Sequence, residues 1–218
     1  MAKTDAGTTA EFGCETSGTG CETSNFVALL QRMRYIERWA LMRGSRPENL
    51  SEHSLDVAVV AHMLATIARV RHGADVDPAR CAVVAVYHDA SEVVTGDMPT
   101  PVKYHSDTLR GAYRALEDMA ADRLTAMLPE GMQPAFTPYL RPEDDNTWQL
   151  VKAADRISAY VKCVEEQRAG NHEFDAAGEN IRASLEAMSL PEVRDFMAEF
   201  VPSFALTLDE LNRPGGAS

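Results

Sequence analysis

Residues 82–92 read AVVAVYHDASE: a run of apolar residues is followed directly by His88 and Asp89, and Glu92 comes three positions later. The run alone is typical of any buried element, but the preceding Asp77-Pro78 pair indicates a helix, because aspartate caps a helix and proline fits its first turn. We expect this helix to run to about residue 94 and to end at Gly96. An imidazole and a carboxylate are rarely buried unless they are paired or bind a metal.

Two further polar residues lie in apolar helical patterns elsewhere in the chain. His53 falls in the first turn of a helix expected from about residue 49 to residue 71, and Asp155 falls within a helix expected over 146–169. Imidazole and carboxylate ligands together suit divalent transition metals, and Co, Mn, Zn, Fe and Ni are equally compatible with this set. Glu92 shares a helix face with His88 and Asp89, which makes it a candidate general acid or base beside the metal.

The rest of the chain shows helical spacing as well. A first helix should bear the apolar residues between Phe26 and Ile36, with Arg38 and Trp39 at its C-terminal end, and other helices are expected over 107–128, 178–188 and 191–200. Prolines should keep residues 97–101 and 129–142 out of regular helix. Because alternating runs rich in Val, Ile and Thr are missing from the sequence, we predict an all-α fold, a helical bundle with the metal site between its core helices.

Composition limits the class of partner. The 218 residues have a net charge of −12, so the surface should repel the phosphates of a nucleic acid. No apolar run approaches the length of a membrane span, and residues 1–24 lack the apolar core of a signal peptide, so we expect a cytoplasmic protein. Residues 1–24, in which GCETS occurs twice, and residues 213–218 are predicted to be flexible, leaving one domain over 25–212.

Three smaller expectations concern residues outside the metal set. Cys81 and Cys163 lie in apolar helical stretches and should be small core residues. The Glu165-Glu166 pair reads as part of a solvated helix face, and Lys103 as a surface residue.

The pattern of His53, His88-Asp89 about 35 residues later and a distant Asp155 resembles the signature of the HD-domain superfamily of all-helical metal phosphohydrolases. Further stretches are similar to the bacterial 5'-deoxynucleotidase family of the YfbR type. They are IERW at 36–39, SEHSL at 51–55, YHDASE at 87–92, TGDMPTPVKY at 95–104 and, more weakly, FVPSF at 200–204. The similarity covers residues 25–212.

The resemblance implies hydrolysis of deoxyribonucleoside 5'-monophosphates to deoxynucleoside and phosphate. The implied metal ligands are His53, His88, Asp89 and Asp155, and the implied acid/base residue is Glu92. Arg38 would orient the phosphate and Trp39 would lie near the sugar. The nucleotide pocket would be completed by Asp97, Met98, Pro99 and Thr100, with Asp89 and Asp155 also contacting substrate. Members of the family are homodimers, so a homodimer is expected.

Two other functions remain open at this point. An HD-domain deoxynucleoside triphosphate hydrolase could use the same metal site, although it should offer extra cations for the longer phosphate chain, and few lie near the motifs. A non-catalytic metal or nucleotide sensor would not need Glu92, whose presence argues against it. Cyclic-nucleotide phosphodiesterases are less favoured, because the pocket motifs differ.

Overall fold

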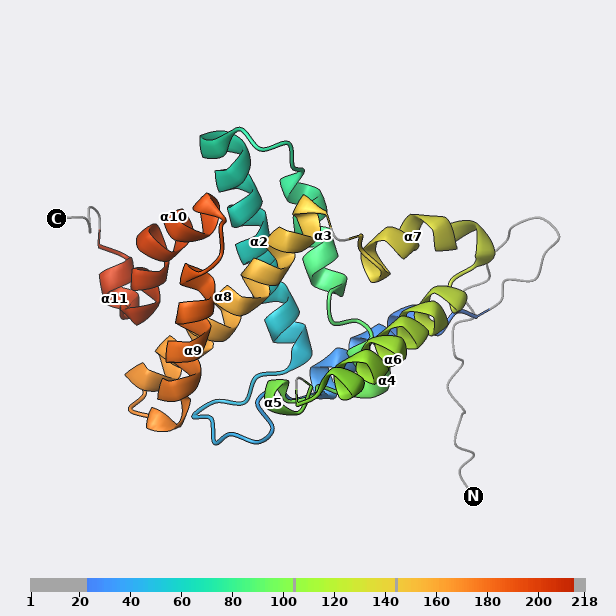
Figure 1. The fold of residues 1–218 in the computed structure, drawn as a ribbon, viewed down its shortest axis with the longest axis horizontal. Coiled ribbons are helices and arrows are strands. Elements are labelled where there is room, and N and C mark those ends of the chain that lie inside the picture. The colour runs from blue at the N-terminus through green and yellow to red at the C-terminus, as the bar shows by residue number, and fades with distance from the viewer. Residues whose placement is uncertain (1–22, 104, 144, 214–218) are drawn as a thin grey trace, which may run out of the picture.

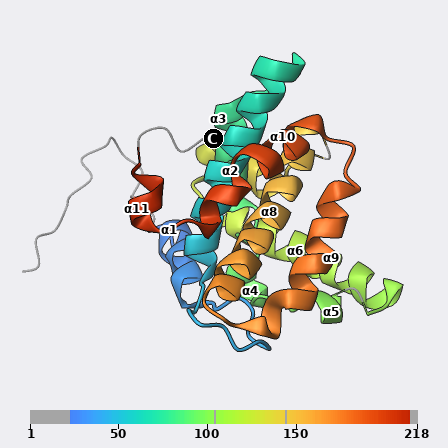
Figure 2. The same ribbon diagram turned by 90° about the vertical axis from the view of Figure 1, so that its left-hand side faces the viewer.

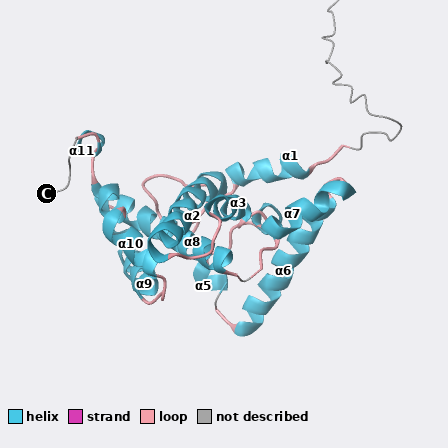
Figure 3. Cartoon of the chain, turned by 90° about the horizontal axis from the view of Figure 1, so that it is seen from above, coloured by secondary structure: helices cyan, strands magenta, loops and turns pink. Residues whose placement is uncertain are grey.

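A computed structural model describes residues 23–103, 105–143 and 145–213. Within them the chain forms helices and loops, and the single β-type contact is an isolated bridge between Glu37 and Asn49 (Figure 3). The predicted all-α class is therefore confirmed. The helices are α1 (Phe26–Leu30), α2 (Leu50–His72), α3 (Pro78–Tyr87), α4 (Glu92–Thr95), α5 (Thr100–Lys103), α6 (Asp107–Ala126), α7 (Gln133–Leu140), α8 (Asn146–Arg168), α9 (Asp175–Glu186), α10 (Pro191–Glu199) and α11 (Leu208–Leu211).

Helix α2 is the centre of the core. It begins where the Asn49 side chain accepts hydrogen bonds from the N–H groups of Ser51 and Glu52, and it ends at Gly73, whose φ of 67° favours glycine. Its apolar face, which includes Val57 and Leu64, is buried in the core. Helices α3, α8 and α10 pack directly against it (Figure 1). Seen from the side, α8, α9 and α10 form the layer nearest the viewer, and α11 lies at the edge of the molecule (Figure 2).

A second apolar cluster lies beside this core and joins α1, α6 and α7. Phe26 and Leu124 are buried in it, and the ring of Phe136 makes edge contacts with Phe26 and Tyr87. Tyr87 is the last residue of α3, so this cluster meets the main core at the end of α3 that carries His88 and Asp89. The two clusters thus flank the metal motif.

The first helix is shorter than expected. Helix α1 ends at Leu30, a 3₁₀ helix covers Gln31–Tyr35, and the following residues are extended. The reason is a local pairing: the N–H of Arg38 donates to the carbonyl of Glu48, and the N–H of Leu50 donates to the carbonyl of Ile36. The prediction that Arg38 and Trp39 end a helix is therefore wrong, because both lie in a bend that follows the extended residue Ile36 and the bridge residue Glu37.

The third helix breaks at the metal motif. The sequence predicted one helix through residue 94, whereas α3 ends at Tyr87, residues 88–91 form a turn, and α4 begins at Glu92. His88 Nδ1 lies 2.7 Å from the carbonyl oxygen of Ala85. That carbonyl also accepts the N–H of His88, so the backbone tightens from four-residue to three-residue hydrogen bonds at this point.

Two proline-rich segments also contain helix that the sequence did not predict. Helix α7 lies within 129–142, and α5 begins at Thr100 within 97–101. Pro134 falls in the first turn of α7, where its missing N–H has no partner to lose. The packing of the half-buried Phe136 against two aromatic rings favours the helix despite Pro138. The other expected helices are confirmed, with ends shifted by up to three residues.

Glu166 is buried, which contradicts the solvated face expected for it, while Glu165 is exposed. Its two oxygens accept from Lys162 Nζ, from the backbone N–H of Ser45 and from Asn171 Nδ2. Burial raises the pKa of a carboxyl, but these hydrogen bonds outweigh it and lower the pKa of Glu166 to about 2. Lys162 Nζ also donates to the carbonyl of Arg46. The network therefore pins the loop between Trp39 and Glu48 to α8.

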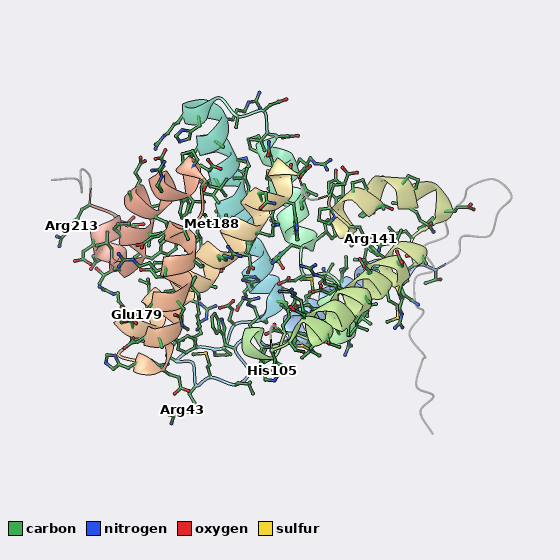
Figure 4. The ribbon with its side chains drawn as sticks, in the orientation of Figure 1. Arg43, His105, Arg141, Glu179, Met188 and Arg213 are labelled. Carbon is green, nitrogen blue, oxygen red and sulfur yellow. The ribbon has the colours of Figure 1, made fainter. Side chains whose placement is uncertain are left out.

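Arg43 marks the outer end of this loop, with its side chain at the edge of the molecule (Figure 4). Its carbonyl accepts a hydrogen bond from Asn171 Nδ2. Both buried cysteines, Cys81 and Cys163, are free thiols in the core, as predicted.

Helix α2 alone, among the described residues, is long and apolar enough to cross a membrane. Most of that stretch is buried against other helices, which is the behaviour of a core helix. The tail predicted over 1–24 and the C-terminus over 213–218 lie outside the described residues, apart from residues 23, 24 and 213.

Replacing Glu166 with alanine should lower the free energy of unfolding by about 3–5 kcal/mol, because it leaves the Lys162 ammonium buried without its partner. Urea unfolding measures the change. The matched control is Glu186→Ala, which removes an exposed ion pair with Arg182 and should cost less than about 1 kcal/mol. Equal effects of the two substitutions would contradict this account of the network.

The lowered pKa of Glu166 also sets a pH dependence. Its contribution to stability is complete above pH 5, where an unfolded glutamate is ionised, and is lost as the pH falls toward 2. Stability measured by urea unfolding at a series of pH values should therefore fall less steeply below pH 5 in Glu166→Ala than in the wild type.

Candidate metal centre and active site

Three of the four predicted metal ligands meet where α2 and α3 lie antiparallel, with the start of α2 beside the end of α3 (Figure 1). His53 occupies the first turn of α2, and His88 and Asp89 follow the last residue of α3. One atom from each of these three residues lies within 4.8 Å of the others. Asp89 Oδ2 is 3.1 Å from His88 Nε2 and 3.6 Å from His53 Nε2.

Asp155, the fourth predicted ligand, comes from the middle of α8. Its Oδ1 atom lies 3.1 Å from His53 Nε2, and its side chain is 42% exposed, so it borders the cluster on the open side. The structure therefore brings all four residues together, although Asp155 is less tightly grouped than the other three. Helices α2, α3 and α8 pack directly on one another, which fixes this arrangement.

The outer nitrogens of both imidazoles are held by the protein. His88 Nδ1 lies 2.7 Å from the carbonyl of Ala85, which can only accept, so Nδ1 carries the proton. His53 Nδ1 faces Ser158 Oγ at 3.3 Å and Glu48 Oε1 at 3.5 Å. Both Nε2 atoms are buried, and neither makes a well-directed hydrogen bond, although a carboxylate oxygen lies 3.1 Å from each. Two unpartnered nitrogens turned toward two carboxylates fit a bound divalent ion.

The electrostatics of the cluster are those of a cation site. Burial alone would lower the pKa of His88, but the carboxylates of Asp89 and Asp155 outweigh it and raise that pKa to about 9. Burial would raise the pKa of Asp89, but the neighbouring imidazoles and Arg38 bring it below its usual range. The carboxylates therefore favour positive charge at this point, which a protonated imidazole or a divalent ion would supply.

Arg38 joins the cluster from the bend after the 3₁₀ helix. Its Nε donates to Glu48 Oε1 at 2.9 Å, and its Nη1 lies 3.5 Å from Asp89 Oδ2. Burial would lower the pKa of Arg38, but the carboxylates of Asp155, Asp89, Glu48 and Asp97 raise it, so the guanidinium remains charged. The predicted pocket residue Asp97 therefore lies within electrostatic reach of Arg38.

Glu92 is buried beside the cluster, and its Oε2 atom has no hydrogen-bond partner. Burial, followed by the Asp89 and Asp97 carboxylates, raises the pKa of Glu92 to about 10. These surroundings favour the protonated form of the carboxyl. A buried carboxyl in this state can donate a proton to a reacting oxygen.

The remaining predicted substrate residues are less closely tied to the cluster. Trp39 has a positive φ of 60°, and its ring packs edge-on against Phe174 with its Nε1 buried and unpartnered. Met98 and Pro99 lie between α4 and α5, where the Pro99 carbonyl accepts from Val102 and Lys103. The side chain of Thr100 lies outside what the structure describes. Lys103 is only partly exposed and is paired with Glu117.

Sequence reasoning missed Glu48 and Ser158. Both reach His53 Nδ1, and Glu48 also binds Arg38. Ser158 lies about one turn after Asp155, so its place on the same face of α8 was a signal that could have been used. Glu48 precedes the helix cap in a loop and carried no periodic signal.

The family model for YfbR-like 5'-deoxynucleotidases matches residues 25–204. The chain belongs to this family. A 5'-deoxynucleotidase from Vibrio parahaemolyticus is 48% identical over 193 residues, which are 87% of this chain and 98% of the relative. The 5'-deoxynucleotidase YfbR from Escherichia coli O1:K1 is 48% identical over 192 residues, covering 87% and 96% of the two chains.

Solved structures share the fold of this YfbR-like chain. An HD-domain phosphohydrolase from Listeria innocua aligns with a TM-score of 0.72 at 22% identity, over 83% of this chain and 88% of the other. A cyanophage S-2L HD phosphohydrolase bound to dA and one catalytic Zn²⁺ ion aligns with a TM-score of 0.56 at 21% identity, over 82% and 95%. Identities this low establish the HD-domain fold alone.

Replacing Asp155 with alanine should reduce the amount of Mn²⁺ or Co²⁺ bound, because one anionic ligand is removed. Metal content after equilibrium dialysis measures the loss. The matched control is Asp118→Ala, which removes an exposed aspartate paired with Arg141 and should leave metal content unchanged. A wild-type metal content in Asp155→Ala would remove this residue from the ligand set.

Proposed function

We propose that this protein is a metal-dependent 5'-deoxynucleotidase that hydrolyses deoxyribonucleoside 5'-monophosphates to deoxynucleoside and phosphate. The observation that carries the proposal is the near full-length, 48% identical match to relatives named 5'-deoxynucleotidase. The cluster of His53, His88 and Asp89 with unpartnered ring nitrogens supports it from the geometry.

In this proposal His53, His88, Asp89 and Asp155 hold the metal, and the donor set leaves the choice among Co, Mn, Zn, Fe and Ni open. When bound, the divalent ion supplies Lewis acidity toward the phosphate and makes a hydroxide nucleophile available near neutral pH. Asp89 and Asp155 would also contact the substrate, because both carboxylates lie close enough to Arg38 to raise its pKa.

Arg38 would bind the phosphate. Its Nε is occupied by Glu48, which leaves N–H groups of the guanidinium on the cluster side for the phosphate oxygens. Two cationic groups, the guanidinium and the metal, would then neutralise a dianion that gains charge on the departing oxygen. Glu92, which is buried beside the cluster, would act as the general acid and give a proton to that 5'-oxygen as the P–O bond breaks.

Trp39 would contact the sugar, and the pocket wall would be formed by Asp97, Met98, Pro99 and Thr100. The homodimer and the cytoplasmic location expected from the sequence stay predictions, as does the expectation that neither nucleic acid nor a membrane is a partner.

The relatives' activity favours a monophosphate substrate over the triphosphate alternative. A triphosphate needs further cations along its phosphate chain. Lys103 lies near the site, but its ammonium donates to Glu117 and rests on the ring of Tyr113.

A substrate panel tests the proposed activity. With Mn²⁺ or Co²⁺ added, phosphate release should be seen from dAMP and dUMP, with AMP as the ribonucleotide comparison and dATP as the triphosphate comparison. Release of pyrophosphate or triphosphate from dATP, with no metal-dependent phosphate from any deoxynucleoside monophosphate, would contradict the proposal.

Replacing Glu92 with glutamine should reduce kcat by about 10²–10⁴-fold, because general acid catalysis is lost. Metal content should stay at the wild-type level, since Glu92 is not a ligand in this proposal. Glu130→Gln, an exposed glutamate beside α7, is the control and should leave kcat unchanged. A near-normal kcat in Glu92→Gln would refute the acid role.

A further inference from the structure

We propose that Glu48 is a positioning residue of this active site, whose single carboxylate holds both the phosphate-binding Arg38 and the metal ligand His53 in their working orientations. The inference rests on the proposed function, because Arg38 and His53 have these roles there. Glu48 itself touches neither metal nor substrate in this account.

The contact with Arg38 is a buried, charge-assisted hydrogen bond. Glu48 Oε1 accepts from Arg38 Nε at 2.9 Å, and the two side chains are 14% and 13% exposed. A guanidinium is a rigid planar fork, so fixing Nε fixes the direction of the other N–H groups. One of them, Nη1, points toward Asp89 Oδ2 at 3.5 Å. Glu48 thereby aims the guanidinium at the metal cluster.

The contact with His53 decides which ring nitrogen carries the proton. The same oxygen, Glu48 Oε1, lies 3.5 Å from His53 Nδ1, and Ser158 Oγ lies 3.3 Å from it. A hydroxyl can either donate or accept, whereas a carboxylate can only accept. The negative charge of Glu48 beside Nδ1 therefore favours the form with the proton on Nδ1, which Ser158 Oγ can accept, and this form leaves the Nε2 lone pair facing Asp89 and Asp155.

The side chain of Glu48 is not what shapes the surrounding backbone. The segment is held by two backbone hydrogen bonds, from Arg38 to the Glu48 carbonyl and from Leu50 to the Ile36 carbonyl. Helix α2 is capped by Asn49, and that bond also does not involve the Glu48 carboxylate. Changing this carboxylate therefore tests positioning, with the fold left in place.

The test compares Glu48→Gln with Glu52→Gln. Gln keeps the size of Glu but lacks its charge. Glu52 lies one helical turn away from Glu48 and makes an exposed pair with Arg46, so it is a matched control. The dissociation constant of Mn²⁺ is measured by calorimetry without nucleotide, KM and kcat for dAMP are measured at saturating Mn²⁺, and thermal unfolding reports on the fold.

Glu48→Gln should weaken Mn²⁺ binding by about 10–100-fold, the usual effect of losing the outer partner of a ligating histidine. It should raise KM about tenfold while kcat changes by less than about threefold, because Arg38 loses orientation and the acid Glu92 is untouched. In Glu52→Gln both quantities should stay within about twofold of the wild type.

Repeating the test in an Arg38→Ala variant separates the contact of Glu48 with Arg38 from its contact with His53. In Arg38→Ala, adding Glu48→Gln should raise KM no further, since the arginine through which Glu48 acts is absent. The same addition should still weaken Mn²⁺ binding through His53. A further rise in KM in this background would contradict the Arg38 contact, and unchanged Mn²⁺ affinity would contradict the His53 contact.

Wild-type Mn²⁺ affinity and KM in Glu48→Gln would overturn the inference and leave the proposed function intact. Absence of deoxynucleotidase activity in the wild type would overturn the proposed function, and the calorimetric result would still decide the His53 contact. Should Glu48→Gln unfold, Glu48→Asp keeps the charge and withdraws it by one methylene. Wild-type values for Glu48→Asp would then overturn the inference.

Discussion

The site depends on one constraint: two imidazole nitrogens and two carboxylates from three helices must converge on a single point. Like-charged carboxylates repel, and buried lone pairs without a partner are costly, so such a convergence persists only where positive charge balances it. Here Arg38 supplies part of that balance, and the carboxylates of Asp89 and Asp155 raise the pKa of His88, which favours its cationic form. The packing of α2, α3 and α8 supplies the rigidity that holds the groups at this spacing.

That constraint also explains where the helices stop. Helix α3 ends one residue before His88, and the turn that follows lets Asp89 and Glu92 both face the cluster from a shortened segment. Helix α2 starts at Leu50, three residues before His53, so this proposed ligand lies in the first turn, which Asn49 caps. On the other side, the Lys162–Glu166 network anchors the loop that leads from Trp39 to Glu48. The helix is thus interrupted at residues 88–91, where the side chains of the site have to turn toward the cluster.

Much of this arrangement could be predicted from the sequence, and the failures have physical causes. The long core helices were predicted from apolar periodicity, and the four candidate ligands were singled out because a polar residue within such a pattern is conspicuous. The break at His88 was missed because a side-chain hydrogen bond to the Ala85 carbonyl caused it, and periodicity does not record such bonds. Helix α7 was missed because distant packing of Phe136 outweighed its prolines.

Glu48 was missed because its partners are brought to it by backbone pairing. The burial of Glu166 was missed because its hydrogen-bond partners give no local signal. Ser45 is 121 positions away in the chain, and Asn171 lies beyond the end of α8.

Residues 36–38 pair with residues 48–50 through local backbone hydrogen bonds. The Arg38–Glu48 pair can therefore form earlier in folding than the cluster around His53. Arg38 and Glu48 are separated by 10 positions, whereas His53 and Ser158 are separated by 105. Closing a loop of about 10 residues takes on the order of 10–100 ns, while a contact between distant helices has to wait for the core to assemble. The Arg38–Glu48 pair can thus form from local contacts alone, whereas the proposed metal centre requires the packed helices. A fluctuation that detaches α8 would remove Asp155 and Ser158 together and leave the Arg38–Glu48 pair in place.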